Sequence, residues 1–391
     1  MDIIAVLSQE LSVPKTQIES AVKLMDEGNT IPFIARYRKE VTGGLDDTIL
    51  RNLEERLHYL RNLEKRKQEV LELIAASGKL DDKQMEQMQK ALEEAKMLSE
   101  VEDLYRPYKQ KRKTRASVAR EKGLEPLAKF MLMQKPGGDL EQEAARYINA
   151  EKGVEDVEQA LSGAGDILAE EISDSAQIRS RLREYLQKNA QISTTKGTKE
   201  NQIYDMYSEY SESVRRIAPH RILAIDRGER EEALKVSVEI DQQICVGMIE
   251  NQVIHRNSPF AKALHEVCED SFKRLIFPSL ERELRAQLTE KACAQAIGVF
   301  SENLKNLLMQ PPVKGCVTMG FDPAYRTGCK IAVVDETGKV LDTTVVYPTP
   351  PQNRTEQAKQ VLGSLIEKYG VTVIAIGNGT ASKESEIFVA E

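Results

Sequence analysis

Asp322 is the residue whose position in this sequence most directly suggests chemistry. It follows an apolar stretch, residues 317–321, that predicts a buried strand, and it precedes a turn over residues 323–328. A carboxylate at the end of a strand can hold Mg²⁺, which activates water and stabilises a leaving oxygen, but a two-metal site needs further acids. Alternatively, Asp322 caps the turn by accepting hydrogen bonds from the backbone N–H groups of residues 324–328. We favour the capping interpretation.

A basic segment, residues 109–122, contains almost no acids and follows Tyr105 and Tyr108. Pro107 and the polar residues after it favour a loop or an extended stretch over a helix. Lys and Arg can neutralise phosphates, and a neighbouring Tyr can stack on a base. The alternative is that these cations pair with acidic helices nearby, notably residues 93–103. The candidate nucleic-acid contacts are Lys109, Lys111, Arg112, Lys113, Arg115 and Arg120.

Two further clusters of cations are weaker candidates for the same kind of contact. Arg36, Arg38 and Lys39 lie in a segment, 29–47, that we expect to be rich in loops. Arg227 belongs to the second cluster, and Arg227-Gly228 could turn a helix-turn-helix-like unit toward a duplex. Its other members are Arg215, Arg216, His220, Arg221 and Arg230. For both clusters we favour structural salt bridges over contacts with nucleic acid.

The cysteines and histidines predict neither a metal site nor a nucleophile. Five cysteines are widely spaced without a C-x-x-C pair, and four histidines are scattered without an H-x-x-x-H pair. We therefore expect reduced thiols, no metal and no cofactor.

The composition is that of a soluble and mostly helical protein. Charged residues make up 30% of the 391 residues and aromatic residues only 5%, with no Trp. No apolar run approaches the roughly 20 residues that span a bilayer, and the N-terminus lacks the basic flank of a signal peptide. We expect a cytoplasmic location and no membrane contact. The net charge of -7 disfavours nucleic-acid binding by the chain as a whole. Whether a nucleic acid can bind therefore depends on where cations cluster locally.

Helical patterns account for most of the first 310 residues. Asp46 or Asp47 caps a long helix that ends at Gly78. A helical stretch over 258–310 is expected to break near Pro278 and to end at Pro311-Pro312, a rigid hinge. Other predicted helices cover 81–104, 124–134, 139–151, 154–172, 174–189 and 199–217, with an exposed connection over 194–200 and one strand over 234–240.

The last quarter predicts a mixed α/β arrangement. Three hairpin-linked strands over 317–321, 330–336 and 339–349 are followed by a helix over 355–369 and a buried strand over 371–377. This is the start of a ribonuclease-H-like layered sheet. The expected fold class is therefore mainly α, with a multi-helical body and a long connector helix, followed by an α/β domain. We divide the chain into domains over residues 1–200, 201–312 and 313–391.

Several long blocks resemble the Tex family of bacterial transcription accessory proteins. They include PFIARYRKEVTGGLDD, LYRPYKQKRKTRASVAREKGLEPLA, HRILAIDRGE, GFDPAYRTGCKIAVVDETGKVLDT and AIGNGTASKESEIFVAE. The last two resemble the YqgF-type ribonuclease-H-like domain of that family. The resemblance implies an RNA-binding transcription accessory protein, with RNA, DNA and RNA polymerase as partners. Because family members continue into helix-hairpin-helix modules and an oligonucleotide-binding-fold domain, we expect this chain to be an N-terminal portion.

The resemblance also assigns Asp322, Arg326 and Asn378 to a vestigial ribonuclease-H-like site. A second acid would lie near the end of the fourth strand, where the sequence is Gly377-Asn378-Gly379. We therefore expect a monomeric, non-catalytic platform and no nuclease activity. Two alternatives stay open: a metal-dependent nuclease or resolvase centred on Asp322, and a protein-interaction scaffold without direct nucleic-acid contact.

Overall fold

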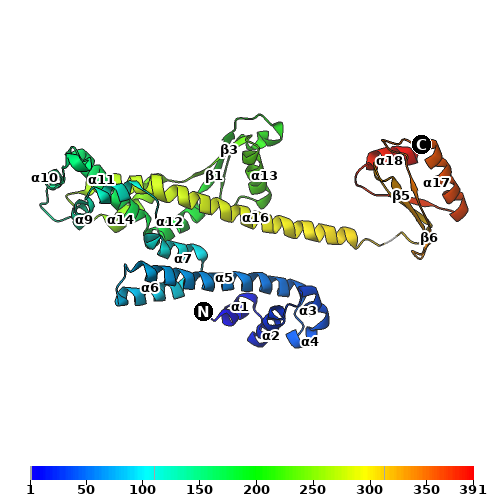
Figure 1. Cartoon of the computed structure of the whole chain (residues 1–391), viewed down its shortest axis with the longest axis horizontal. Coiled ribbons are helices and arrows are strands. Elements are labelled where there is room, and N and C mark those ends of the chain that lie inside the picture. Colours follow the sequence, from blue (N-terminus) through cyan, green and yellow to red (C-terminus); the bar gives the residue numbers. More distant parts are fainter. Residues whose placement is uncertain (1, 110, 312) are drawn as a thin grey trace. The chain divides into compact units, whose positions relative to one another are not determined.

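The computed structural model describes residues 2–109, 111–311 and 313–391. The chain divides into two compact units between Ile297 and Gly298, inside helix α16 (Phe277–Leu308), and Figure 1 shows the elements of each. In the described part of the chain, no helix is both long and apolar enough to cross a membrane. The predicted hinge at Pro311-Pro312 includes Pro312, which lies outside the described residues.

The N-terminal part of the first unit is built on one long helix, α5 (Asp47–Ser77). The Asp46 carboxylate accepts a hydrogen bond from the Ile49 N–H at 2.8 Å, and Gly78 ends the helix with a φ of 62°, as the sequence predicts. Leu side chains of α5 are buried in a core that they share with the preceding short helices, which lie along α5 in Figure 1. The short helices are α1 (Ile3–Leu11), α2 (Lys15–Asp26), α3 (Ile31–Tyr37) and α4 (Lys39–Thr42); the first three contribute side chains to this core, and α4 packs against α2 and α3.

The prediction of a loop-rich segment over 29–47 is wrong, because α3 and α4 lie there. Pro32 is in the first turn of α3, where its missing N–H costs no hydrogen bond. Ile31 and Ile34 are buried, and α3 packs against α5. Tertiary burial therefore makes a helix of a segment whose glycines and polar residues suggest turns.

The single helix expected over 81–104 is two helices, α6 (Asp82–Glu94) and α7 (Leu98–Tyr105). The Glu100 carboxylate accepts hydrogen bonds from the backbone N–H groups of Lys96 and Met97 at 2.6 and 3.1 Å. It thereby satisfies donors at the start of α7, and the chain leaves the helical conformation between α6 and α7.

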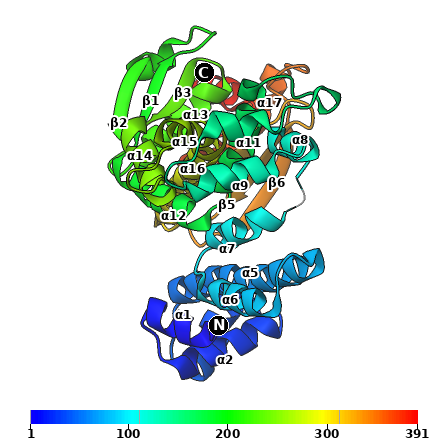
Figure 2. The ribbon, with the colours of Figure 1, turned by 90° about the vertical axis from the view of Figure 1, so that its left-hand side faces the viewer.

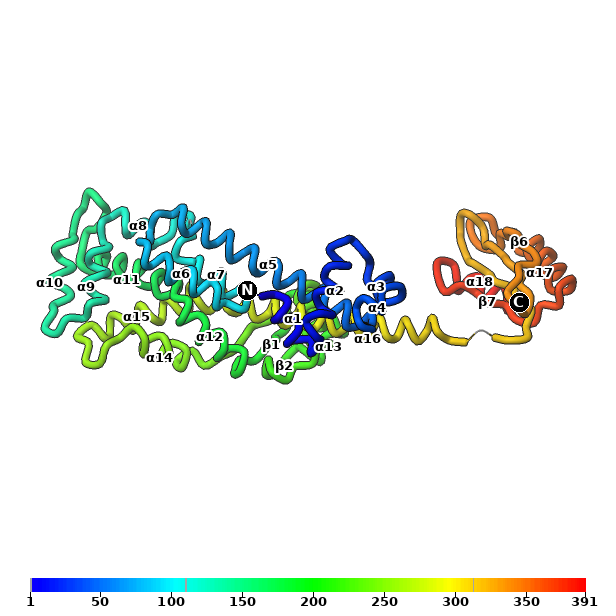
Figure 3. Tube along the Cα trace, turned by 90° about the horizontal axis from the view of Figure 1, so that it is seen from below, coloured from blue at the N-terminus to red at the C-terminus, as the bar shows by residue number. Residues whose placement is uncertain are grey.

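A second hydrophobic core holds the other helices of the first unit together. Figure 2 shows α9, α11, α14 and α15 gathered around α16, and Figure 3 shows α9 to α11 together at one end of this unit. The helices are α8 (Arg115–Glu121), α9 (Glu125–Met133), α10 (Leu140–Ala145), α11 (Val157–Ser173), α12 (Ala176–Asn189), α13 (Pro219–Arg230), α14 (Gln242–Val253) and α15 (Ala261–Asp270), with short turns η1 (Arg106–Tyr108), η2 (Ala150–Lys152) and η3 (Gln202–Tyr207).

The sequence suggested that the helix breaks near Pro278, but the structure shows no break there. A π-helical segment, η4 (Ser271–Ile276), joins α15 directly to α16. The π-helical segment already departs from the regular α-helical hydrogen bonds just before Pro278. The N–H donor that this proline lacks is therefore missing from a stretch whose hydrogen bonding is irregular anyway. From there α16 continues to Leu308 and forms the long connector helix that the sequence predicts.

The first unit also contains a three-stranded antiparallel sheet, in the order β2-β1-β3. The strands are β1 (Gln191–Lys196), β2 (Glu209–Ser213) and β3 (Leu234–Glu239). Only β3 was predicted. The exposed connection expected over 194–200 is wrong for residues 194–196, which belong to β1, and correct for 197–200, whereas the helix expected over 199–217 is wrong. The polar sequence of β1 gives a weak local signal. Its Ile192 and Thr194 are buried because they lie opposite Val238 and Val236 of β3.

The second unit has the predicted mixed sheet, in the order β6-β5-β4-β7, with β7 parallel to β4. Its helix α17 packs on one face, against a core that includes Met319, Phe321 and Ile331. The expectation that β7 is buried is wrong, because β7 is an edge strand here and Ala375 is exposed on the other face. The elements are β4 (Thr318–Asp322), β5 (Cys329–Val334), β6 (Val340–Val346), α17 (Thr355–Tyr369), β7 (Val373–Ile376) and α18 (Ser382–Ala390).

The observed fold class agrees with the sequence: a mainly helical body, a long connector helix and an α/β domain. The division into three domains at residues 200 and 312 stays a prediction.

Candidate nucleic-acid interface

The basic segment starts as a loop and ends as a helix. Residues 109 and 111–114 are not helical, as predicted, but Arg115 begins α8. The Thr114 hydroxyl accepts a hydrogen bond from the Ser117 N–H at 3.0 Å and caps that helix. Ala116 and Ala119 are buried, and α8 packs against α11. This burial explains why the polar sequence around them becomes helical.

Two of the six predicted cations are bound by acids of the last turns of α11. The Lys111 ammonium lies 2.5 Å from Asp174 and 3.6 Å from Glu170, and Arg120 lies 2.9 Å from Glu170. Burial raises the pKa of Glu170, but the hydrogen bond from Arg120 and the charge of Lys111 outweigh it and leave that pKa below its ordinary value. The partners are therefore on α11 and not on residues 93–103, where the alternative interpretation placed them.

The other four predicted cations carry no such partner. Lys109, Arg112, Lys113 and Arg115 are exposed, and among the described residues none of them has a carboxylate within 4 Å. Arg115 lines a hollow with Asp166. Burial raises the pKa of the Asp166 carboxyl and the charge of Arg115 acts to lower it, but the direct ion pair of Asp166 is with Arg274, at 2.9 Å. The structure thus brings together four unpaired cations on a segment that Lys111 and Arg120 fix in place.

The two tyrosines before this segment are packed rather than free. Tyr105 and Tyr108 are half-buried against the core of the N-terminal helices, and the Arg66 guanidinium lies 5.7 Å from the centre of the Tyr105 ring. Burial also raises the pKa of Tyr108. The expectation that one of them stacks on a base is therefore not supported by this geometry.

The first weaker cluster lies on α3 and at the start of α4. Arg36, Arg38 and Lys39 are exposed, and in the described chain none of them forms an ion pair, so that the structural salt bridges we expected are wrong for these three. The Arg38 guanidinium lies 5.2 Å from the centre of the Phe33 ring. Sequence reasoning did not single out Phe33, because nothing in the sequence shows which aromatic side chains remain at the surface.

The second weaker cluster has the expected salt bridges only in part: Arg221 pairs with Glu212 at 2.8 Å and Arg227 pairs with Glu231, whereas among the described residues Arg215, Arg216 and Arg230 have no carboxylate within 4 Å. Arg227 lies 2.9 Å from Glu231, as expected. Gly228 is buried inside α13 and makes no turn, so that the helix-turn-helix-like unit expected there is wrong: α13 leads into β3. A side chain at Gly228 would put its Cβ 2.7 Å from Leu234 and 3.0 Å from Tyr204, so this glycine serves close packing and not a turn.

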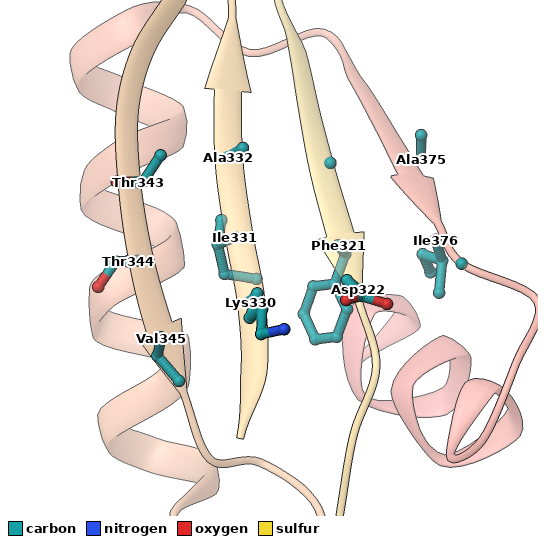
Figure 4. Close-up of a pocket in the computed structure, with 12 residues that line it drawn as sticks. Phe321, Asp322, Lys330, Ile331, Ala332, Thr343, Thr344, Val345, Ala375 and Ile376 are labelled. Carbon is teal, nitrogen blue, oxygen red and sulfur yellow. The ribbon is translucent and has the colours of Figure 1, made fainter. Parts of the chain in front are cut away.

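Asp322 lies at an open face of the second sheet, opposite Lys330 (Figure 4). Its carboxylate is exposed and accepts no hydrogen bond from any described residue, so the predicted turn cap is wrong. Asp335 has that role in the next turn, with hydrogen bonds from the N–H groups of Thr337 and Lys339 at 2.8 and 3.0 Å. Four strands line a hollow of about 790 Å³ on this face.

The register of β4 and β7 decides what stands beside Asp322. Phe321 is opposite Ile376, and a Cβ placed on Gly377 would lie 3.7 Å from Oδ1 of Asp322. The position next to the carboxylate is therefore a glycine, while Arg326 and Asn378 are exposed. Among the described residues, no group of three or more His, Cys, Asp or Glu side chains could hold a metal ion.

A buried ionic cluster was not found by sequence reasoning. Asp103 of α7 accepts hydrogen bonds from Arg179 and Arg183 of α12, both at 2.5 Å, and Arg183 also donates to Glu283 of α16 at 2.6 Å. Arg179 is 2% exposed and donates to Ser279 at 3.1 Å. The spacing of the two arginines is a local signal, but their partners are far away in the sequence. The cluster ties α7 to the helical body.

Three models of one family match the chain. They are the Tex-like protein N-terminal domain over residues 1–75, the Tex central region-like model over 135–300 and the Tex protein YqgF-like domain over 316–391.

Relatives align over nearly the whole chain. It is 47% identical over 388 residues to the uncharacterized protein YdcI of Bacillus subtilis, an alignment that covers 98% of this chain and 53% of the relative. It is 43% identical over 400 residues to the transcriptional accessory protein Tex of Neisseria gonorrhoeae, covering 100% of this chain and 51% of the relative. It is 34% identical over 408 residues to the human S1 RNA-binding domain-containing protein 1, an alignment that covers 100% of this chain and 40% of the relative.

The chain thus spans about half the length of the bacterial relatives that it matches. The three family models follow one another in order and together match the greater part of the sequence, and the relatives share at least a third of its residues. The resemblance inferred from the sequence blocks is confirmed: this chain belongs to the Tex family.

Proposed function

We propose that this chain is a non-catalytic, nucleic-acid-contacting platform of a transcription accessory protein, with RNA as its principal ligand and DNA as a second one. One relative is named a transcriptional accessory protein and another an S1 RNA-binding domain-containing protein. The observation that carries the proposal is the set of exposed and unpaired cations on the basic segment: Lys109, Arg112, Lys113 and Arg115.

The ion pairs of the segment support this role. Lys111 and Arg120 fix it to α11, so that less chain entropy is lost when its free cations meet a phosphate backbone. A cation that is already paired would have to give up its carboxylate before it could neutralise a phosphate. The unpaired side chains carry no such cost, and each phosphate contact releases counterions from the nucleic acid.

The test is the salt dependence of binding to single-stranded RNA and to duplex DNA. A variant with Lys109, Arg112 and Lys113 changed to Ala should reduce the slope of log K against log salt by about 2 for RNA and by about 3 for duplex DNA. The matched control changes Lys79, Lys83 and Lys90, which are likewise exposed and have no carboxylate within 4 Å in the described chain. Equal slopes for the two variants would contradict the proposal.

A metal-dependent nuclease centred on Asp322 is the alternative, favoured by the exposed carboxylate on the open sheet face. We expect no cleavage of labelled RNA or DNA in Mg²⁺, because Gly377 occupies the position beside Asp322. Cleavage that Asp322→Asn abolishes would replace our proposal with the nuclease.

We further propose that the platform works in the cytoplasm as a monomer beside RNA polymerase, with functional parts at residues 1–200, 201–312 and 313–391. Light scattering tests the monomer, and pull-down with purified polymerase tests the partner. Polymerase binding that survives in a chain unable to bind RNA would favour the alternative of a pure protein-interaction scaffold.

A further inference from the structure

The surface of α3 combines one exposed aromatic ring with unpaired cations. Tyr37 is 61% exposed, in a chain with few aromatic residues. Its ring centre lies 5.4 Å from that of Phe33, and the Arg38 guanidinium lies 5.2 Å from the Phe33 ring. Tyr37 packs against the Phe33 ring and is otherwise open to a ligand, whereas the cation of Arg38 packs on Phe33 and not on Tyr37.

The charge of this surface is positive. Arg36, Arg38 and Lys39 are exposed and form no ion pair in the described chain, against one exposed acid in the same stretch, Glu40. Glu40 is four residues after Arg36, the spacing of a helical ion pair. The pair does not form, because the helix is interrupted at Arg38, whose φ is -128°.

Two acids lie near these cations but are already engaged. Arg36 and Lys39 line a hollow of about 450 Å³ together with Asp46 and Asp47. Asp46 accepts the N–H of Ile49 at the start of α5, and Asp47 accepts the Arg51 side chain at 2.7 Å. In the described chain neither carboxylate forms an ion pair within 4 Å with a cation of α3.

The backbone under this surface is fixed. Ile31 and Ile34 of α3 are buried in the core around α5, so the exposed side chains stand on an anchored helix. Aromatic faces beside cations on a rigid support are the features that proteins use to hold single-stranded nucleic acid, whose bases stack while its phosphates are neutralised. A duplex hides its base faces and cannot use such a ring.

We propose that α3 and the start of α4 form a base-stacking platform for single-stranded nucleic acid. Tyr37 stacks on a base, and Arg36, Arg38 and Lys39 neutralise the adjoining phosphates. This inference rests on the proposed function and adds to it a second contact site with a preference for single strands, which the basic segment alone does not provide.

The first test compares Tyr37→Ala with Tyr37→Phe in the chain of residues 1–391. Tyr37→Ala should weaken binding to a 12-nucleotide single-stranded RNA at least about fivefold, the lower end of the cost of losing one base stack. Tyr37→Phe keeps the ring and should stay within about twofold of the parent chain, as should the binding of both variants to duplex DNA. Unchanged circular dichroism checks folding.

The second test measures the contact of a base with the side chain at position 37 by fluorescence. Because the chain has no Trp, Tyr37→Trp introduces a single tryptophan that can be excited apart from the tyrosines, and single-stranded RNA should quench its emission. The control is Phe300→Trp, at a position of similar exposure, 67% against 61%, where no quenching is expected.

The outcomes separate the two proposals. If Tyr37→Ala binds RNA as the parent does while the Lys109, Arg112 and Lys113 variant does not, the platform is overturned and the proposed function stands. If Tyr37→Ala loses RNA affinity while the Lys109, Arg112 and Lys113 variant keeps it, the platform is supported and the basic segment is not part of the interface. A parent chain that binds no single-stranded RNA overturns both proposals.

Discussion

The substitution Asp103→Ala tests whether the buried ionic cluster holds α7 against the helical body. Asp103 is 4% exposed and is the carboxylate that accepts from both Arg179 and Arg183. Arg183 keeps a second carboxylate, Glu283, after the change. Arg179 keeps only the hydroxyl of Ser279 and becomes a buried, unpaired cation.

The expected loss of stability follows from that difference. Breaking a buried ion pair by removing one partner costs roughly 3–5 kcal/mol, because the other charge stays buried. Since one of the two arginines retains its carboxylate, we expect the lower end, about 3 kcal/mol. Asp26→Ala is the matched control: Asp26 pairs with Arg61 at 2.7 Å, but both side chains are about half exposed, and such pairs are worth less than about 1 kcal/mol.

Hydrogen exchange of the amides in α7 and α12 is the appropriate assay, because a chain of two compact units need not unfold in one step. A loss of about 3 kcal/mol corresponds to exchange roughly 100-fold faster in these helices. The double variant Asp103→Ala with Arg179→Met should recover most of that protection, since no unpaired charge remains buried. Protection in Asp103→Ala equal to that in Asp26→Ala would refute the argument.

Two further predictions concern titrating side chains. Burial raises the pKa of Cys245 and Cys268 to about 12, so a thiol reagent at pH 8 should label the exposed Cys293 at once and the two buried thiols only on unfolding. The hydrogen bond to Glu250 raises the pKa of His265 above its ordinary 6.5. The protonated pair thus stabilises the fold fully below the unfolded pKa and loses this effect as pH rises through the folded pKa. His265→Gln should therefore cost up to about 1 kcal/mol at pH 6 and nothing at pH 9, measured by hydrogen exchange of the amides in α14 and α15, corrected for the intrinsic exchange rate at each pH; equal costs at both would contradict it.

The parts of the fold that the sequence predicts correctly are those with complete local signals. Helix α5 has a capping carboxylate at Asp46, a stop at Gly78 and leucines at helical spacing between them. The strands of the second unit are separated by short turns such as that at Gly338, and α17 supplies the crossover to the parallel strand β7. Each of these helices, strands and turns is signalled by residues of its own stretch, although the pairing of β4 with β7 joins residues 55 apart, such as Thr318 and Val373.

The incorrect predictions depend on partners that lie far away in the sequence. Strand β1 is recognisable only once β3 pairs with it, about 40 residues later. Lys111 and Arg120 find their carboxylates 63 and 50 residues away, on α11. A count of local charge treats these two cations like Lys109 and Arg112, although the fold neutralises the first two and leaves the others available to a ligand.

Even a local rule can fail when a helix ends in an unexpected place. Arg227 and Arg36 each have a glutamate four residues later, Glu231 and Glu40. The first pair forms at 2.9 Å because the backbone stays helical up to Arg230, the residue before Glu231, whereas the second does not form because the helix is interrupted at Arg38, between Arg36 and Glu40. Helix ends are the least reliable part of any prediction from sequence. They decide here which arginine is consumed by a salt bridge and which remains free to bind a phosphate, and only the structure places them.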